Sequence, residues 1–356
     1  MVYTHDFERH IRKRIAKRDF NNIGSRSVPL TPEERKEIIE FWKPYRDVTK
    51  HLHWFEFYKA SCQDLTKLKY YLPDSIYYTE IDIFFNSPRR CQILDDKNLY
   101  DLFFHDVKMP GTIVRKVNGQ LMDNNYNLLT LEQAVERCQN AREGVGKTAR
   151  MSGGAHGVQF FDFSSITDDV MQYLNRYDDF IIQETIQQHE FFNNIHASSI
   201  NTLRIMTLFL NGEVNVVSSV FRMGAGGSRV DNGSSGGVFV GVNPDGTLME
   251  FAHYTDGRTT TQHPQGTVFK GLKVVGYDSC VRLAKKLSLR FLNATKLISW
   301  DFAVDPDGDP VLIETNLTYG GLSTHQLSKG PLYGERTAEI LSLVYSKGKK
   351  NTYYES

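Results

Sequence analysis

Two β-prone runs flank a turn-forming string near the C-terminus, and this pattern limits the possible folds more than any other segment does. The segment covers residues 297–316 and reads L-I-S-W-D-F-A-V-D-P-D-G-D-P-V-L-I-E-T-N. The apolar runs on either side of D-P-D-G-D-P predict an antiparallel hairpin. If the turn closes with Asp305 opposite Pro310, counting outward along both strands places Asp301 directly opposite Glu314.

The predicted hairpin brings three oxygen-bearing side chains to one face. Two carboxylates at the ~5 Å of a cross-strand pair, here Asp301 and Glu314, repel each other unless a cation lies between them. Asn316 lies two residues beyond Glu314 and therefore projects from the same face. Hard oxygen ligands that leave room for phosphate and water suit Mg²⁺ better than zinc. The alternative is a surface hairpin with solvated acids, which describes Asp307 and Asp309 in the turn.

Composition excludes several classes of protein. The chain has 356 residues, with 42 Lys+Arg against 42 Asp+Glu, and a non-specific nucleic-acid binder usually carries a basic excess. Its cysteines are scattered without a C-x-x-C pair, which indicates reduced thiols in a cytoplasmic protein, not a disulfide framework or zinc site. They are Cys62, Cys91, Cys138 and Cys280. No apolar run approaches the ~18 residues of a membrane span. The length allows two or three subdomains.

Capping signals mark the start of two helices. Thr31 and Glu34 form a capping box ahead of a helix that we expect to run to about Trp42, and Thr130 with Gln133 start another. Two further helices are predicted near residues 278–289 and 335–345. The aromatic-rich stretch 54–85 predicts the core of a small α/β unit, although aromatic residues also line substrate clefts.

The first 20 residues are basic, with Phe7, Ile11 and Ile15 at helical spacing. A helix lying on an anionic surface is one interpretation. We favour a packed helix with a solvated basic face.

The string A-R-E-G-V-G-K-T at 141–148 resembles a phosphate-binding P-loop only superficially. A P-loop needs glycine where Ala141 stands, a strand before the loop and a helix after it. Here a predicted helix precedes the string and glycines follow it. We therefore reject a P-loop nucleoside triphosphatase, while Lys147 can still contact phosphate by another route.

The spacing D-x₁₂-E-x-N of the hairpin resembles the Mg²⁺-ATP signature of the ATP-grasp superfamily. Further segments follow in the order of that superfamily: L-D-D-K-N-L-Y-D-L-F at 94–103, G-K-T-A-R-M-S-G-G-A-H-G-V at 146–158 and F-I-I-Q-E-T-I at 180–186. The middle block is more particular, with N-T-L-R-I-M-T at 201–207, R-M-G at 222–224 and V-D-N-G-S-S-G-G at 230–237. It is similar to the sugar-transfer-associated ATP-grasp family, relatives of the α-L-glutamate ligases. Thr148 departs from the proline that many relatives have after the lysine.

The resemblance implies an α+β ATP-grasp fold, with two α+β subdomains gripping ATP between antiparallel sheets. It covers roughly residues 90–345. We expect an N-terminal helical and α/β region at 1–90, the ATP-grasp domain at 91–345 and a tail at 346–356. Within that domain, a flap subdomain is expected at about 112–182 and a C-terminal subdomain at about 183–345.

The resemblance also implies a set of ATP and metal contacts. Two Mg²⁺ ions, which Mn²⁺ can replace, would be held by Asp301, Glu314 and Asn316. Lys97 and Lys147 would neutralise the phosphates. The flap would cap the phosphates with backbone N–H groups. The expected nucleotide contacts are Lys97, Lys147, Ser152, Gly153, Gly154, Gly157, Gln183, the Glu184 carbonyl and the Ile186 N–H. Glu190 is a candidate for the ribose hydroxyls or equally a surface acid.

A carboxylate substrate needs a cation of its own. Arg222 and Arg204 are candidates because a guanidinium pairs with a carboxylate through two hydrogen bonds. The alternative for either is a structural ion pair with an acid such as Asp231. Asn232 could donate a hydrogen bond to the acyl group.

These residues suit an ADP-forming, amide-bond-forming ligase that joins a carboxylate to an amine or thiol through an acyl phosphate. Its partners would be small carboxylate and amine substrates, including sugar- or glycan-linked ones, with no nucleic acid. The expected pathway is glycan biosynthesis, including that of polysaccharides, or the biosynthesis of amino-acid conjugates. Two alternatives stay open: a phosphotransferase acting on a hydroxyl, and a nucleotide-binding protein without turnover.

Overall fold

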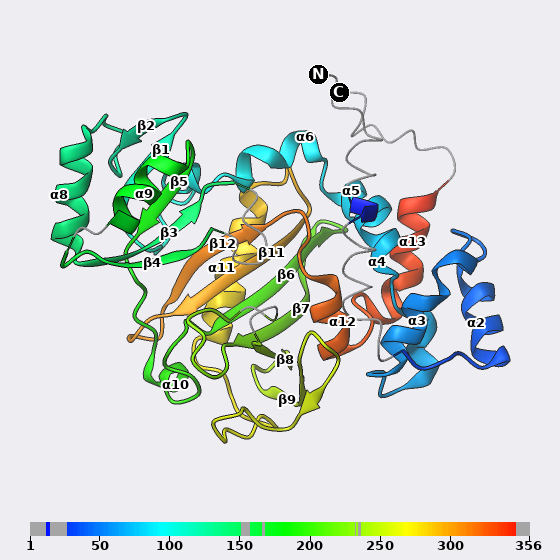
Figure 1. The fold of residues 1–356 in the computed structure, drawn as a ribbon. Helices are drawn as coiled ribbons and strands as arrows, with labels where there is room; N and C mark the ends of the chain where they lie inside the picture. Colours follow the sequence, from blue (N-terminus) through cyan, green and yellow to red (C-terminus); the bar gives the residue numbers. More distant parts are fainter. Residues whose placement is uncertain are drawn as a thin grey trace.

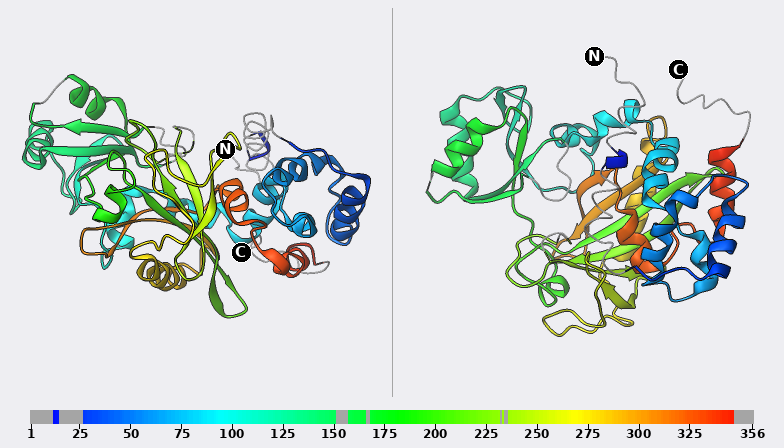
Figure 2. Two further views of the ribbon diagram at one scale, coloured as in Figure 1. Left: turned by 90° about the horizontal axis from the view of Figure 1, so that it is seen from below. Right: turned by 45° about the vertical axis from the view of Figure 1, so that its right-hand side comes forward.

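Two antiparallel sheets organise the protein in the computed structural model, which describes residues 12–14, 27–150, 157–165, 168–231, 233 and 236–346. The small sheet has five strands in the order β2-β1-β5-β3-β4, and the large sheet has seven in the order β10-β9-β8-β7-β6-β11-β12. Figures 1 and 2 show the small sheet at one end, helices of the N-terminal region at the other, and the large sheet between them. Both sheets are antiparallel, as expected for an ATP-grasp fold and unlike a doubly wound sheet.

The small sheet carries its own apolar core. Its strands are β1 (Thr112–Val117), β2 (Gln120–Met122), β3 (Glu143–Thr148), β4 (Gln159–Asp162) and β5 (Phe180–Gln183). Helices α8 (Leu131–Ala141) and α9 (Asp168–Arg176) pack against it through Ala134, Cys138, Tyr173 and Leu174. The predicted capping box of α8 is confirmed, since Thr130 accepts from the Gln133 N–H at 3.3 Å. We did not predict α9.

The string that mimics a P-loop lies in β3. A Cβ added to Gly146 would lie 2.7 Å from the ring of Tyr173 and 2.8 Å from that of Phe161, and one added to Gly144 would meet Phe163 at 2.8 Å. These glycines therefore let aromatic rings pack against the strand. The rejection of a P-loop is confirmed.

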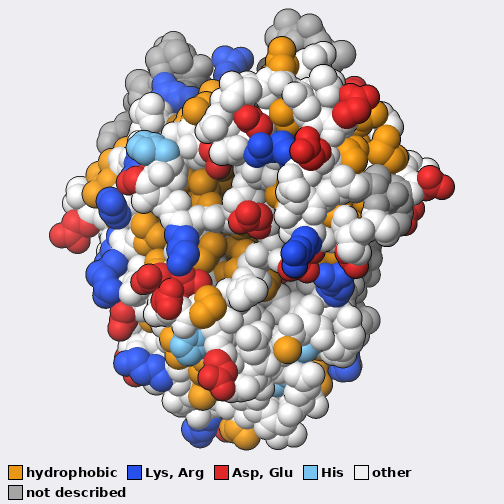
Figure 3. Space-filling view, turned by 90° about the vertical axis from the view of Figure 1, so that its left-hand side faces the viewer, with side chains coloured by type: hydrophobic (Ala, Val, Ile, Leu, Met, Phe, Trp, Pro, Cys, Tyr) orange, Lys and Arg blue, Asp and Glu red, His pale blue; other side chains and the backbone are white. Residues whose placement is uncertain are grey.

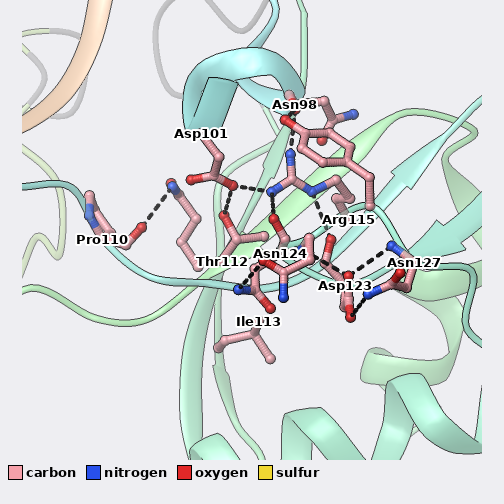
Figure 4. A network of polar contacts seen from close by, with 12 residues as sticks. Asn98, Asp101, Pro110, Thr112, Ile113, Arg115, Asp123, Asn124 and Asn127 are labelled. Atoms are coloured by element: carbon pink, nitrogen blue, oxygen red, sulfur yellow. Dashed lines mark hydrogen bonds and ion pairs between the residues drawn. The ribbon is translucent and has the colours of Figure 1, made fainter. Parts of the chain in front are cut away.

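Figure 4 shows how the small sheet is tied to the segment before it. Arg115 on β1 is fully buried and pairs with Asp101, while its remaining donors reach the carbonyl groups of Asn98 and, at 3.2 Å, Asp123. Its guanidinium also stacks 4.1 Å from the ring centre of Tyr126. A buried cation with this many acceptors fixes residues 98–101 against the sheet.

The large sheet is buried on both faces. Its strands are β6 (Thr202–Leu210), β7 (Glu213–Met223), β8 (Val238–Val242), β9 (Leu248–His253), β10 (Thr259–Thr260), β11 (Leu297–Val304) and β12 (Pro310–Asn316). Along β6, Leu203 and Ile205 belong to the core with α11 (Tyr277–Arg290), whereas Met206 and Leu208 belong to the core with the N-terminal helices. This switch follows from the alternation of side chains along a strand.

The N-terminal region is helical, so the expected α/β unit is wrong in its strands. Within described residues 27–111 no strand forms. The helical elements are α2 (Pro32–Trp42), η2 (Thr49–His51), α3 (Leu52–Lys59), η3 (Leu65–Tyr70), α4 (Asp74–Ile76), η4 (Tyr77–Ile81), α5 (Asp82–Phe85), α6 (Pro88–Cys91), η5 (Gln92–Asp95), η6 (Lys97–Leu99) and α7 (Tyr100–Phe103). Aromatic residues are frequent in strands, but here helix packing decides. Trp54, Phe55 and Tyr58 of α3 are buried in the core of this region, as predicted for the aromatic stretch.

Three C-terminal elements complete the helical end: α12 (Leu322–Lys329), η9 (Gly334–Arg336) and α13 (Thr337–Tyr345). Short α10 (Glu190–Asn193) follows β5. The predicted helix start at Thr31 is confirmed, with both bonds of the capping box present. Among the described helices, none has the length and hydropathy needed to cross a bilayer.

Residues 12–14 are the described part of the basic N-terminal segment. Arg12 is fully buried and pairs with Asp82 at 2.6 Å and with the Tyr78 carbonyl at 3.0 Å. The expectation of a solvated basic face is therefore wrong for Arg12, whereas Lys13 and Arg14 are exposed. The rest of that segment lies outside the described residues.

Candidate active site

The hairpin β11–β12 places Asp301 opposite Glu314, as predicted. The predicted pairing at the turn is wrong by one residue, because Val304 and not Asp305 pairs with Pro310. Asp305 is instead a turn residue that accepts hydrogen bonds from the N–H groups of Asp307 (3.0 Å) and Asp309 (2.8 Å). A bulge next to Asp301 absorbs the difference, since the next pair in the ladder joins Phe302 to Leu312.

Asp301 is the centre of a buried ionic network. Arg204 on β6 donates to both of its carboxylate oxygens, through Nε at 2.7 Å and Nη2 at 2.5 Å. Arg222 on β7 adds a bond at 3.1 Å, and the amide of Asn316 lies 3.4 Å from the same oxygen. Burial alone would raise the pKa of Asp301, but the two guanidinium groups hold it below its usual range. The carboxylate is therefore ionised.

Arg222 has a second acidic partner. Its Nη2 donates to Asp231 at 3.0 Å, and Asp231 also accepts a hydrogen bond from the Thr202 hydroxyl. This is the structural ion pair that we considered for Arg222.

Arg204 is about as buried as Arg222, with side chains 13% and 11% exposed, but it differs in its hydrogen bonds. Within the described residues, its Nη1 makes no hydrogen bond. Gly321 has no side chain over this atom, and a Cβ there would lie 3.1 Å from it. Arg204 therefore presents an edge that a substrate carboxylate could occupy.

Lys97 and Glu314 form the second charged pair of the site. Lys97 Nζ lies 3.3 Å from Glu314 Oε2, and the two side chains are 9% and 27% exposed. Burial is the largest influence on Lys97 and would lower its pKa, but Glu314, Tyr100 and Asp95 together raise the pKa above its usual value. The predicted phosphate lysine of residues 94–103 therefore lies beside the predicted metal ligand.

Lys147 approaches from the small sheet. It extends from β3 and donates to the side chain of Gln183 on β5 at 3.1 Å. Burial lowers the pKa of Lys147 to about 8, a shift that the charge of Glu314 opposes and that of Lys97 assists. Both lysines and Glu314 are close enough to influence one another, so the structure brings these three predicted residues together from η6, β3 and β12.

The predicted adenine hinge follows β5. Gln183 is buried, and its Nε2 reaches the Pro110 carbonyl at 3.3 Å. The Glu184 N–H bonds the Gly111 carbonyl at 2.8 Å, whereas neither the Glu184 carbonyl nor the Ile186 N–H has a backbone partner in the described part of the chain. The Glu184 carbonyl and the Ile186 N–H are thus an acceptor and a donor, two residues apart, that a planar ligand can bind. Glu190 is exposed at the start of α10, and nothing in its surroundings favours the ribose role.

The flap is described only at its end. Ser152, Gly153 and Gly154 lie outside the described residues, as does Asn232 in the middle block. Gly157 has φ +79° and packs on Thr148, since a Cβ there would be 2.7 Å from the Thr148 methyl group. Glycine is therefore required where the chain returns from the flap.

Two residues that support the site were not predicted from the sequence. Burial raises the pKa of Asp95 to about 6, with Lys97 opposing and Glu314 adding to the shift, so this carboxyl group lies near the charged pair. Its only sequence signal was its place in the segment that carries Lys97.

The second is Asn86, a buried residue of the helical region. Its amide nitrogen donates to the Leu297 and Leu317 carbonyls, both at 2.7 Å, and its oxygen accepts from the Thr295 hydroxyl at 2.6 Å. It thus closes the end of the hairpin away from the turn, and no local motif marks it.

The donor set fits magnesium. Glu314, Asn316 and Asp301 offer two carboxylates and an amide oxygen on one hairpin face, and hard oxygen ligands suit Mg²⁺. In the described residues no group of three or more His, Cys, Asp or Glu could hold a metal. Arg204 and Arg222 compensate Asp301, which leaves Glu314 as the principal candidate ligand in this arrangement.

A protein-family model agrees with this geometry. The model for sugar-transfer-associated ATP-grasp proteins matches residues 78–342, which is more than half of the chain. The chain belongs to the sugar-transfer-associated ATP-grasp family. The predicted family and the predicted α+β ATP-grasp fold are confirmed.

Solved structures resemble this ATP-grasp chain at low identity. One is D-alanyl-alanine synthetase A from Vibrio cholerae O1 biovar eltor str. N16961, with 12% identity over 76% of this chain and 68% of that one, and a TM-score of 0.45. Another is L-amino acid ligase from Bacillus licheniformis, with 14% identity over 71% of this chain and a TM-score of 0.42. The match covers 48% of that ligase, about half of its length.

A third is D-cycloserine synthetase DcsG, with 15% identity over 72% of this chain and 73% of that one, and a TM-score of 0.42. No match is found among curated proteins. These distant likenesses say nothing about the substrate of this chain.

Proposed function

We propose that this ATP-grasp chain is an ATP- and Mg²⁺-dependent ligase that activates a carboxylate as an acyl phosphate and passes it to an amine or thiol. The observation that carries the proposal is the convergence of Lys97, Lys147 and Glu314 from separate elements. Two cations beside a metal-binding acid suit the polyphosphate of ATP, which would lie between the two sheets.

Each residue has a defined part in this reaction. Lys97 and Lys147 hold phosphate oxygens, and the hinge at 184–186 reads the adenine edge. Glu314, with Asn316 and Asp301, holds up to two Mg²⁺ ions, which when bound neutralise the charge of the transferring phosphoryl group. Mn²⁺ has the same preference for oxygen ligands and can serve instead.

Arg204 is the better candidate for the substrate carboxylate. Its Nη1 makes no hydrogen bond within the described residues, whereas Arg222 uses Nη1 for Asp301 and Nη2 for Asp231. We assign to Arg222 the role of keeping Asp301 and Arg204 in place. The carboxylate oxygen attacks the γ-phosphorus and ADP leaves; the amine or thiol then attacks the acyl carbon and phosphate leaves.

The substrate class follows from the family description alone. We propose a sugar-, glycan- or amino-acid-linked carboxylate or amine, as expected for a protein of polysaccharide biosynthesis. A cytoplasmic location agrees with the four free cysteines. On the face that carries the small sheet, acidic and basic side chains are interspersed without a large patch of one sign, which does not favour a nucleic-acid partner (Figure 3).

Hydroxylamine trapping tests the proposal. The protein is incubated with ATP, Mg²⁺ and pools of carboxylates, and hydroxylamine replaces the natural nucleophile. An ATP-dependent hydroxamate is expected, because a good nucleophile intercepts an acyl phosphate. ADP formation from a hydroxylated compound without any hydroxamate would instead establish a phosphotransferase.

Two arginine variants then locate the carboxylate. Arg204→Lys should lower kcat/KM for the carboxylate about 10²-fold, because lysine lacks the second donor of the planar fork. The KM for ATP should stay nearly unchanged, because Lys97 and Lys147 are untouched. Arg222→Lys should lower the free energy of unfolding, and its loss in kcat/KM should be smaller than that of Arg204→Lys. A larger loss in kcat/KM for Arg222→Lys than for Arg204→Lys would instead assign the substrate carboxylate to Arg222.

A further inference from the structure

A pocket of about 530 Å³ lies near the junction of α6, α7 and the end of α11, outside the proposed nucleotide site. Its apolar surface comes from Leu94, Phe103 and Phe291, with Ile93 at the rim. Figure 1 shows the segment containing α6 over the upper end of α11. We refer to it as the α6–α11 pocket. Its volume is in the range of small-molecule sites.

The charges of the α6–α11 pocket have one sign. Arg90 and Arg290 line it, and no acidic residue does. Arg290 is fixed in place, because it donates to both carboxylate oxygens of Asp106 at 2.8 Å and to the Phe103 carbonyl at 3.0 Å. Asp106 also has Lys286 at 3.7 Å. Asp106 is thus shared between two cations. Arg90 donates to the Asn293 carbonyl at 3.3 Å, so the lining holds two guanidinium groups and no carboxylate.

Exposed apolar side chains also occur on the elements that line the pocket. Ile93 is 56% exposed although it is part of the pocket. Leu102 and Leu289, the neighbours in sequence of the pocket residues Phe103 and Arg290, are 56% and 54% exposed. These three belong to the few large apolar side chains that stay exposed in the described part of the chain. A concave apolar surface beside fixed cations is typical of a binding site.

We propose that the α6–α11 pocket binds a small amphipathic anion. Its apolar body packs on Phe103, Phe291 and Ile93, and its carboxylate, sulfonate or phosphate lies between Arg90 and Arg290. The pocket is distinct from the nucleotide site but adjacent to it. Leu94 lines it, and the Leu94 carbonyl accepts a hydrogen bond at 3.3 Å from Thr315, the residue between Glu314 and Asn316.

Fluorescence titration with 8-anilinonaphthalene-1-sulfonate tests the proposal on the full chain. The titration is done with saturating Mg²⁺-ATP, so that the nucleotide site is filled. Saturable binding in the micromolar range, displaced by decanoate, is expected. Complete loss of the saturable signal when ATP is added would place the probe in the nucleotide site and overturn the proposal.

Three variants locate the bound probe. Ile93→Glu puts a negative charge at the rim on a side chain that is already exposed, and should weaken binding ~tenfold, about 1.4 kcal/mol. Arg90→Gln should weaken the sulfonate but not the neutral N-phenyl-1-naphthylamine. Leu65→Glu, an equivalent change at an exposed leucine of η3, should have no effect. Equal affinity in Ile93→Glu and Leu65→Glu would refute the proposal, provided that both variants give wild-type circular dichroism spectra.

Discussion

Arg204 donates to both carboxylate oxygens of Asp301, at 2.7 and 2.5 Å, from the neighbouring strand of the large sheet. The sequence indicated a metal ligand at Asp301 and a substrate cation at Arg204, but not that the two would be paired. Asp301 is therefore also a structural residue, because its negative charge holds the buried guanidinium groups of Arg204 and Arg222 in place. Glu314 contacts Lys97 and does not hold these arginines.

Asp301→Asn should therefore destabilise the fold. The amide keeps the shape but leaves Arg204 and Arg222 with less compensation, at a cost of about 3 kcal/mol for a broken buried pair. Urea denaturation measures the free energy of unfolding. The matched change Asp307→Asn, at an exposed acid of the same hairpin, should leave that free energy nearly unchanged. Equal stability of the two variants would show that Asp301 does not support the arginines.

Glu314→Gln should do the opposite, keeping the fold and losing catalysis. Removing the charge that the metal and the lysines share should lower ADP formation about 10²-fold, since one such electrostatic contact contributes about 3 kcal/mol. ADP release at saturating Mg²⁺ measures the effect, with urea denaturation as the control for folding. Near-normal turnover would remove Glu314 from the site.

The affinity for ATP should fall as the pH rises through about 8. Burial lowers the pKa of Lys147 to about 8, so the ligand-free protein loses most of this positive charge between about pH 7 and about pH 9. Calorimetric titration with Mg²⁺-ATP measures the change. Lys147→Arg should flatten the profile, because arginine stays charged throughout. A wild-type profile as flat as that of the variant would contradict the assignment.

The same shift predicts how stability depends on pH. An unfolded lysine titrates near about 10.4, so between about pH 8 and that value the unfolded chain binds more protons than the folded one. The contribution of Lys147 to stability therefore rises with pH in this window, while ATP affinity falls. Urea denaturation at both ends of the window should show a smaller rise in Lys147→Met than in the wild type.

Gly146→Ala tests whether the false P-loop serves packing. The added methyl group would meet the rings of Tyr173 and Phe161, so we expect about 1–3 kcal/mol of destabilisation. Gly227→Ala, where the new Cβ meets nothing within 4 Å, is the matched control. Thermal unfolding with and without ATP distinguishes a loss of packing from a loss of ATP binding. A phosphate-binding role would instead weaken ATP binding and leave the unfolding of the ligand-free protein unchanged.

Asn86→Ala tests the closure of the hairpin from the helical region. The substitution leaves the Leu317 carbonyl without its donor and the Leu297 N–H without its acceptor, at a cost of about 1–3 kcal/mol for each unsatisfied group. The Leu297 carbonyl keeps the Thr295 hydroxyl as a donor. Urea denaturation measures this loss. Asn175→Ala, at an exposed position of α9, removes a single local bond to Met171 and should change little. We also expect a weaker Mg²⁺-ATP affinity, since Asn316 adjoins Leu317.

The parts of the fold that were predictable depend on local interactions. The two capping boxes and the hairpin pair residues that are near in sequence, so residue type and spacing suffice to place them. The N-terminal strands were wrong because aromatic residues suit strands and helix interfaces equally, and only the surrounding packing distinguishes them.

Contacts between distant segments could not be predicted. Asn86 joins residues more than two hundred positions away, and Asp231 was one of many acids that could have paired with Arg222. The family resemblance placed Lys97, Lys147 and Glu314 in one site, and the structure brings them together. It gave no indication that Arg204 would hold Asp301, because cross-strand neighbours depend on the order of strands in the sheet.

The bulge beside Asp301 decides which residues can act together. Val304 pairs with Pro310 at the turn, and an uninterrupted ladder from there would set Asp301 opposite Ile313. Glu314 would then point to the other side of the sheet, since neighbours along a strand alternate. The bulge adds one residue to β12 relative to β11, so the side chains of Glu314 and Asp301 lie on the same face of the sheet. An insertion or deletion between these two acids is therefore tolerated only if it keeps both side chains on one face. The turn can thus lengthen by two residues more easily than by one.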